Sequence, residues 1–203
     1  MSNFEYPLIT GGAGFIGSEM VRRLAFDDNI KKIFVVDKLT YAGDLLRIQS
    51  ALSSGKVEFI ESDVRETKNY EKVLGEVDSV FHFAAETHVD RSIRNGEIFY
   101  LSNVLGTYNL LESVRKNGVI RTIVVSTDEV YGSTEFGEFV ETDAFDASSP
   151  YSASKAAAEL AAIAQFKTFS QDVLITRCPN NYGKFQDGEK FIPTVIRRAL
   201  MNH

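Results

Sequence analysis

Short apolar segments alternate with longer helical patterns along the whole chain, which has 203 residues. The sequence predicts strands at 7–10, 32–37, 57–61, 78–84, 120–126 and 172–176, and helices at 15–26, 66–75, 95–117 and 151–170. Several predicted strands are continuously apolar, as expected when helices cover both faces of a parallel sheet. The alternation therefore predicts an α/β fold built on a doubly wound parallel sheet.

Pro7 stands at the start of the first predicted strand. Because proline donates no hydrogen bond to a neighbouring strand, we expect this strand to consist in effect of residues 8–10. No internal repeat, low-complexity tract or linker rich in glycine and serine interrupts the sequence. Residues 1–178 are therefore predicted to form one domain, and a further helix is expected to begin near Phe191 in the remaining segment, 179–203.

The overall charge and the cysteine content narrow the class of protein. The net charge is −6, without a long run of either sign, which argues against a surface for nucleic acid or anionic membranes. Cys178 is the only cysteine, so no intrachain disulfide can form, as suits a reducing cytoplasm. The first residues lack the basic and apolar regions of a signal peptide, and no apolar stretch approaches the ~20 residues that span a bilayer. We expect a soluble cytoplasmic protein.

The stretch TGGAGFIGS, residues 10–18, follows the first predicted strand and opens a helix. Gly11, Gly14 and Gly17 are three residues apart, a spacing that permits a tight turn and lets the backbone approach a pyrophosphate at the helix N-terminus. Glycines collect in any tight turn, but here Asp37 ends the second strand 20 residues after Gly17. The combination predicts a Rossmann dinucleotide site. Asp37 would bind a ribose and repel a 2′-phosphate, which favours NAD, although the neighbouring Lys38 leaves NADP open.

Polar or small residues also follow the third and fourth predicted strands. Asp63 is placed to meet an adenine, or else to cap a helix. Ala84 and Ala85 would let a nicotinamide ribose lie against the backbone, but a sheet edge packed on a helix needs small residues there as well.

Tyr151 and Lys155, in PYSASKAAAE (150–159), are four residues apart at the start of a predicted helix and so share one face. A lysine ammonium beside a phenol lowers the pKa of the tyrosine, which would make Tyr151 a base able to remove a proton from a sugar hydroxyl. On an ordinary amphipathic helix the same pair has no chemical meaning. At the carboxyl ends of a dinucleotide-binding sheet the pair indicates catalysis.

The fifth predicted strand runs into Ser126, Thr127, Asp128 and Glu129 in VVSTDEVYG, 124–132. Two adjacent carboxylates at a strand's end usually form a solvated turn. They can also act as a paired acid and base, if their pKa values differ.

Seven segments in this order resemble the extended short-chain dehydrogenase/reductase family, and within it the nucleotide-sugar 4,6-dehydratases. They are TGGAGFIGS, DKLTYAG, AAETHVDRSI, NVLGTYNLLE, STDEVYG, PYSASKAAAE and TRCPNNYG. The resemblance covers nearly the whole chain.

This resemblance implies roles for individual residues. Phe15 and Ile16 would lie under the pyrophosphate, Asp37, Lys38, Leu39 and Thr40 along the adenosine, Asp63 and Val64 beside the adenine, and Ala84, Ala85 and Thr87 at the nicotinamide and the sugar. Ser102 or Asn103, Tyr151, Lys155 and Asn181 would also contact the cofactor, whereas Asn180 and Lys190 would lie near the substrate diphosphate. No metal site is predicted.

The resemblance further implies an NAD-dependent lyase acting on dTDP-glucose in deoxysugar biosynthesis. Tyr151, with Lys155 as its partner and Thr127 as a hydrogen-bond donor to the reacting sugar oxygen, would permit oxidation at carbon 4. Glu129 would then remove the proton from carbon 5, and Asp128 would protonate the hydroxyl that leaves carbon 6. The hydride would return to carbon 6, giving dTDP-4-keto-6-deoxy-glucose.

Several alternatives stay open from the sequence. A nucleotide-sugar epimerase or decarboxylase needs the tyrosine and lysine but neither acid, and an NAD-binding protein without catalysis needs none of them. Members of the family are longer, so we expect 179–203 to be the beginning of a substrate-binding region in either a fragment or a natural short form. Helices 95–117 and 151–170 are expected to pair with a second subunit in a homodimer, unless the alanines of 156–166 pack only against the chain's own sheet.

Overall fold

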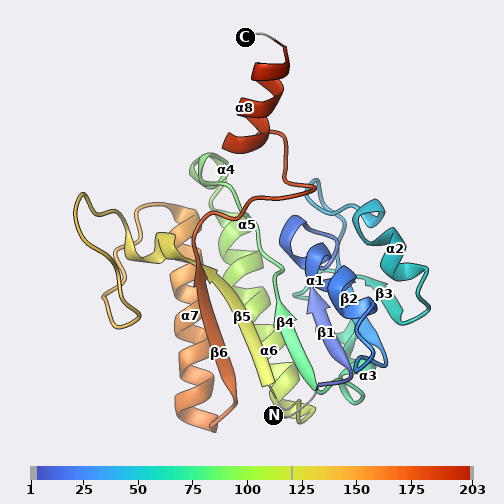
Figure 1. The fold of residues 1–203 in the computed structure, drawn as a ribbon. Helices are drawn as coiled ribbons and strands as arrows, with labels where there is room; N and C mark the ends of the chain where they lie inside the picture. Colours follow the sequence, from blue (N-terminus) through green and yellow to red (C-terminus); the bar gives the residue numbers. More distant parts are fainter. Residues whose placement is uncertain (1–3, 120, 202–203) are drawn as a thin grey trace.

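The computed structural model describes residues 4–119 and 121–201. Within these ranges a six-stranded sheet has the order β3-β2-β1-β4-β5-β6 (Figure 1). The strands are β1 (Pro7–Thr10), β2 (Ile33–Asp37), β3 (Val57–Glu61), β4 (Ser79–His82), β5 (Arg121–Thr127) and β6 (Val173–Cys178). All neighbouring strands are parallel. The winding reverses between β1 and β4, as in a Rossmann sheet, so the predicted fold class is confirmed.

Helices cover the sheet from both sides, as the continuously apolar strands predicted. α1 (Phe15–Ala25) and α2 (Gln49–Leu52) pack on the face that carries Ile9 and Val35. α3 (Glu71–Leu74) and α6 (Gly106–Lys116) pack on the face of Leu8 and Phe34, and α7 (Pro150–Phe169) extends that layer over β5 and β6. The two faces alternate along each strand because successive side chains point in opposite directions.

The helix predicted at 95–117 is divided. It consists of α5 (Glu97–Phe99), a π-helical segment (Tyr100–Leu105) and α6. A Cβ atom at Gly106 would lie 2.6 Å from Cγ1 of Val64, so α6 begins in close contact with the loop after β3. π-helical segments such as Tyr100–Leu105 occur mostly as single turns inserted in α-helices and are frequent at functional sites.

The prediction of a single helix at 66–75 is wrong. The chain instead forms a 3₁₀ turn (Thr67–Asn69) and the one-turn α3, separated at Tyr70, whose φ of −125° is not helical. Tyr70 is fully buried and its hydroxyl donates to the Val64 carbonyl at 2.7 Å. Burying this large side chain in the core overrides the local helical preference.

The strands predicted at 32–37, 78–84, 120–126 and 172–176 differ from the observed strands by one or two residues at their ends, whereas the ranges 7–10 and 57–61 are as predicted. β1 begins at Pro7, which lies opposite Ser79 of β4, so the expectation that the strand starts in effect at residue 8 is wrong. Proline is tolerated there because it is the first residue of the strand. For the strand predicted at 120–126, β5 runs from Arg121 to Thr127, and Ile120 lies outside the described residues.

The carboxyl ends of the strands all face the same edge of the sheet (Figure 1). A 3₁₀ turn (Leu45–Ile48) and α4 (Val89–Arg94) lie in the loops there. The chain after β6 crosses this edge, and α8 (Phe191–Leu200) then extends away from the sheet. None of the helices in the described ranges is both long and apolar enough to cross a bilayer.

Candidate active site

A cavity of about 350 Å³ lies between the carboxyl ends of the strands and the segment 179–190. Most residues predicted from the sequence line it: Gly11, Gly14, Phe15, Ile16, Gly17, Asp37, Lys38, Thr40, Asp63, Val64, Ala84, Ala85, Thr87, Ser102, Thr127, Glu129, Tyr151, Lys155, Asn180, Asn181 and Lys190. Leu39, Asn103 and Asp128 lie outside this lining. The fold thus brings the predicted residues together, while their roles stay predictions.

The glycine turn after β1 forms one end of the cavity. Gly11 has a φ of +71°, and a Cβ atom there would lie 2.6 Å from the backbone nitrogen of Ala84. A Cβ atom at Gly17 would collide with the Gly11 carbonyl. Gly14 precedes α1 without a side-chain cap, and the first turn of α1 contains no acidic residue. The backbone N–H groups at this helix end therefore form a site suited to an anion.

Asp37 is oriented by two backbone N–H groups. Its Oδ2 accepts from Ala13 at 3.0 Å and its Oδ1 from Leu39 at 2.9 Å. Since a carboxylate has about four lone-pair sites, Asp37, which lines the cavity, can accept hydrogen bonds beyond these two. Leu39, with a φ of +50°, contributes through its backbone and not as a cavity wall.

Lys38 is held by acidic side chains. Its Nζ lies 3.1 Å from Oε1 of Glu86 and 3.6 Å from Oδ2 of Asp63, and it donates to the Ser102 hydroxyl at 3.4 Å. The positive charge of Lys38, which had left NADP as a possible cofactor in the sequence analysis, is therefore partly neutralised by Glu86 and Asp63. Glu86 also lines the cavity and was missed from the sequence, although it directly follows Ala84 and Ala85.

Asp63 caps a turn and not a helix, since the helical segments that follow it begin at Thr67 and Glu71; its contact with an adenine stays a prediction. Asp63 lines the cavity, and its Oδ1 accepts from the Arg65 backbone N–H at 2.9 Å, which caps a turn. The Arg65 guanidinium donates to both of its carboxylate oxygens, at 3.0 and 2.9 Å. Burial acts to raise the pKa of Asp63, but the hydrogen bonds from Arg65 outweigh it and hold the pKa below its ordinary value.

A capping box fixes the start of α7 and with it the position of Tyr151. The Ser149 hydroxyl accepts from the Ser152 N–H at 3.1 Å, the Ser149 N–H donates to the Ser152 hydroxyl at 3.0 Å, and Pro150 occupies the first turn. These are strong helix-start signals. Tyr151 and Lys155 consequently reach the cavity from the first two turns of the helix.

The expectation that Lys155 lowers the pKa of Tyr151 is wrong for this structure. Burial, reinforced by the charge of Glu129, raises the pKa of Tyr151 to about 12. The Lys155 ammonium donates to the Val125 carbonyl at 2.7 Å. Burial lowers the pKa of Lys155 itself to about 8, against the attraction of Glu159.

The two acids after β5 are placed differently. Glu129 lines the cavity, whereas Asp128 is exposed and lies outside the lining, with the Thr127 hydroxyl 3.3 Å from its Oδ1. Burial and the adjacent charge of Asp128 raise the pKa of Glu129, and Lys190 opposes the shift. A carboxylate with a raised pKa is a stronger base, so the geometry suits Glu129 to proton removal.

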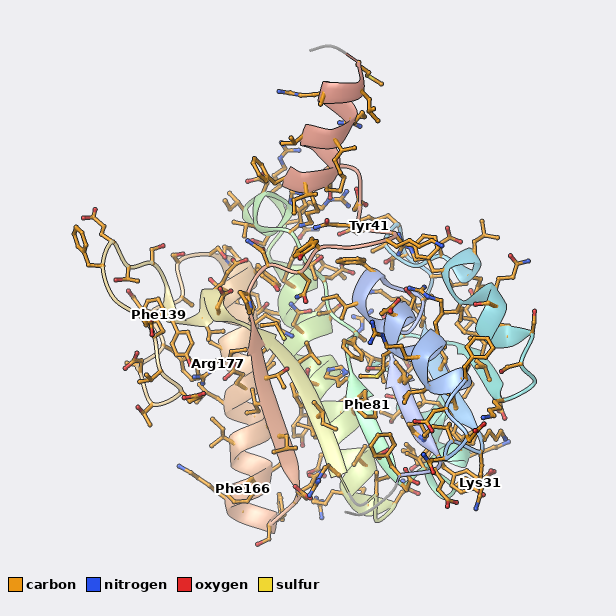
Figure 2. All side chains as sticks on the ribbon, viewed as in Figure 1. Lys31, Tyr41, Phe81, Phe139, Phe166 and Arg177 are labelled. Atoms are coloured by element: carbon orange, nitrogen blue, oxygen red, sulfur yellow. The ribbon has the colours of Figure 1, made fainter. Side chains whose placement is uncertain are left out.

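Further side chains that the sequence analysis missed hold the segment over the cavity. Nε2 of His88 lies 3.3 Å from Oε1 of Glu189, and the Arg91 guanidinium lies 3.7 Å from Oε2. Arg91 also stacks on Tyr41, 3.7 Å from the ring centroid; Tyr41 is labelled above the sheet in Figure 2. His88 has a φ of +97°, an unusual conformation for this residue. In the sequence, nothing identified His88 as a residue near the cavity except its position directly after Thr87.

Residues 8–203 match the family model described as GDP-mannose 4,6 dehydratase. The chain belongs to this family. Among curated members, the dTDP-glucose 4,6-dehydratase of Actinoplanes sp. is 42% identical over 198 residues, covering 95% of this chain and 62% of the relative. The relationship to dehydratases within the extended short-chain dehydrogenase/reductase family, which the sequence segments indicated, is thereby confirmed.

Solved structures of related enzymes have the same fold. A dTDP-glucose 4,6-dehydratase from Streptomyces venezuelae with NAD bound is 42% identical, has a TM-score of 0.92, and is matched over 97% of this chain and 62% of its own. A UDP-N-acetylglucosamine 4-epimerase from Methanobrevibacter ruminantium M1 is 28% identical, with a TM-score of 0.90 and coverages of 100% and 64%. The chain therefore spans less than two thirds of the length of these relatives.

The burial of Lys155 predicts a pH dependence of stability. Between its folded-state pKa of about 8 and the ordinary value of 10.5, the unfolded chain binds more protons than the folded one, so the contribution of Lys155 to the free energy of unfolding rises with pH. Relative to Lys155→Met, the parent should gain on the order of 2 kcal/mol between pH 7.5 and 10. Urea denaturation of both proteins at a series of pH values measures this change in the free energy of unfolding. Lys167→Met, at an exposed position of the same helix, should leave the two pH curves parallel; parallel curves for Lys155→Met would contradict the shift.

Proposed function

We propose that the protein is an NAD-dependent nucleotide-sugar 4,6-dehydratase, a hydro-lyase, acting on dTDP-glucose. The observation that carries the proposal is the position of Glu129 in the same cavity as Tyr151 and Lys155. Oxidation of a sugar needs the tyrosine and the lysine, whereas elimination of water needs an additional base. The dehydratases at about 42% identity support the same assignment.

The chain's residues fit NAD as the cofactor. The glycine turn packs so closely that side chains at Gly11 or Gly17 would clash with neighbouring backbone, and the start of α1 offers N–H groups to a pyrophosphate. Asp37 offers a carboxylate to a ribose, and Lys38 is engaged by Glu86. When bound, NAD would accept a hydride from carbon 4, release it to carbon 6 and place a positive charge in the cavity.

The protein's own residues would move the protons. Tyr151 would take the proton from the hydroxyl on carbon 4, with Thr127 donating a hydrogen bond to the same oxygen. Lys155 would stabilise the resulting charge. The ketone makes the hydrogen on carbon 5 acidic, and Glu129 would remove it. Asp128 would protonate the hydroxyl leaving carbon 6, which requires its exposed side chain to turn toward the substrate.

The reaction balances without an outside oxidant. Substrate minus one water gives the 4-keto-6-deoxy product, and the hydride removed from carbon 4 ends on carbon 6. The second candidate is a 4-epimerase, favoured by the fold similarity to the Methanobrevibacter enzyme. An epimerase has no use for a carboxylate base at position 129, so the effect of removing it distinguishes the two.

The first prediction from this proposal concerns cofactor choice. This chain should bind NAD more tightly than NADP, because the charge of Asp37 repels a 2′-phosphate. Asp37→Asn should weaken NAD binding about tenfold and reduce the preference for NAD over NADP. Calorimetric titration measures both affinities. Asp44→Asn, which removes the same charge from a neighbouring turn outside the cavity lining, should change neither. Equal affinity of the parent for NAD and NADP would contradict the cofactor assignment.

The second concerns elimination. Glu129→Gln keeps the shape of the side chain but cannot accept the proton from carbon 5. With NAD and dTDP-glucose, dehydration should fall by about 10²- to 10⁴-fold while reduced nicotinamide accumulates, as followed by its absorbance. Tyr151→Phe should give neither product nor reduced nicotinamide, and Glu135→Gln, at an exposed acid in the next loop, should behave as the parent. Dehydration at the parental rate in Glu129→Gln would rule out its role as base.

We also propose a homodimer formed through α6 and α7. These helices and the π-helical segment before α6 carry exposed apolar side chains, with Leu105 42%, Tyr108 48% and Leu160 54% accessible. The alanines of α7 divide between two faces: Ala158 and Ala162 are buried on the protein's own side, whereas Ala153, Ala157 and Ala161 are only half-buried. A helix that is apolar on both sides is typical of one that is buried on both sides.

Light scattering tests the dimer. The parent should have twice the mass of one chain, and Leu160→Glu should give a folded monomer because it places a charge in the contact. Leu174→Glu serves as the control, since Leu174 is 49% exposed on β6, on the opposite face from Val173 and Ile175, which pack toward α7. A monomeric parent would refute the proposal.

A further inference from the structure

A chain of buried hydrogen bonds crosses the fold directly beneath the cavity. It starts at Thr10 and His82, the last residues of β1 and β4, which lie opposite each other in the sheet. The Thr10 hydroxyl is 2.7 Å from Nδ1 of His82, and Nε2 of His82 is 2.9 Å from the Thr107 hydroxyl on α6. All three residues are almost completely buried. The sequence analysis assigned no role to any of them.

The direction of these hydrogen bonds is fixed by the Thr107 hydroxyl. Its single proton is donated to the Asn103 carbonyl at 2.6 Å, so towards His82 it must accept, and Nε2 of His82 carries the proton. Nδ1 is then an acceptor and receives the Thr10 hydroxyl proton. Burial and the charge of Lys155 lower the pKa of His82 to about 3, which keeps the ring neutral in this single tautomer.

Beyond Thr107 the chain continues into the walls of the cavity. Oδ1 of Asn103, in the π-helical segment, accepts from the Glu86 N–H at 2.7 Å. Nδ2 of Asn103 donates to the Glu86 carbonyl at 3.0 Å and to the Ser154 hydroxyl at 2.9 Å. Ser154 in turn donates to the Tyr151 carbonyl at 2.7 Å. Asn103 is thus joined both to the residue that binds Lys38 and to the first turns of α7.

We propose that His82 and Thr107 are positioning residues of the cofactor site: they fix the π-helical segment so that Asn103 holds the backbone of Glu86 and the start of α7 at the cavity. This inference rests on the proposed function, since the groups that are positioned are those assigned to NAD and catalysis. It explains why the polar chain lies in the core. A valine in place of Thr107 would fill the same volume without the hydroxyl that binds the Asn103 carbonyl.

The experiment removes the Thr107 hydroxyl by Thr107→Val, which preserves the shape of the side chain. Thr122→Val is the matched control, because the Thr122 hydroxyl is buried in β5 and finds no hydrogen-bond partner among the described residues. Thr107→Ser retains the hydroxyl and tests rescue. Two readouts are used on this chain: amide hydrogen exchange of the Glu86 N–H by NMR, and NAD affinity by calorimetry.

Thr107→Val removes the hydroxyl that donates to Asn103 and accepts from His82. It should speed exchange of the Glu86 N–H and weaken NAD binding, each by at least about tenfold, which corresponds to the loss of one buried hydrogen bond. Thr107→Ser should restore both, and Thr122→Val should change neither. Unaltered Glu86 exchange in Thr107→Val, or equal effects of Thr122→Val, would overturn the positioning role. A parent that fails to bind NAD would refute the proposed function, and the exchange of Glu86 would still decide this inference.

Discussion

The parallel arrangement of the strands is the constraint on which the rest of the structure depends. β1 lies between β2 and β4, and each parallel connection must return along the outside of the sheet, here through helices on both faces. The carboxyl ends of all strands then meet at one edge. The glycine turn, Asp37 and Glu129 lie at the ends of three different strands, β1, β2 and β5, yet they line a single cavity because of this one topological requirement.

Burial controls the chemistry available at that edge. The same exclusion of water raises the pKa of Tyr151 and of Glu129 and lowers that of Lys155. Each shift favours the neutral form of the side chain, so all three groups ionise less readily than they would in water.

Hydrogen bonds, rather than apolar packing alone, connect the two halves of the site. The core below the cavity contains Thr10, His82 and Thr107 at positions where the sheet and α6 would accept apolar side chains. Their bonds lead through Asn103 to Glu86 and Ser154, and so join the end of β1, where the glycine turn begins, to the start of α7. Satisfied buried networks of this kind specify one arrangement, because any alternative leaves a polar group unpaired.

The sheet, the glycine turn, the start of α7 and the position of the two acids after β5 could be predicted from the amino-acid sequence, because strand alternation, glycine spacing and helix caps are local signals. Other features depend on how distant segments pack together. The helix predicted at 66–75 is interrupted at Tyr70, whose side chain is buried in the core. Asp128 and Glu129 are adjacent in sequence, but only Glu129 lines the cavity, whereas Asp128 is exposed. Lys155, four residues from Tyr151, donates to Val125 instead of acidifying the phenol. Those outcomes depend on burial and on partners distant in the chain, such as the Val125 carbonyl and Glu86, which no spacing along the sequence encodes.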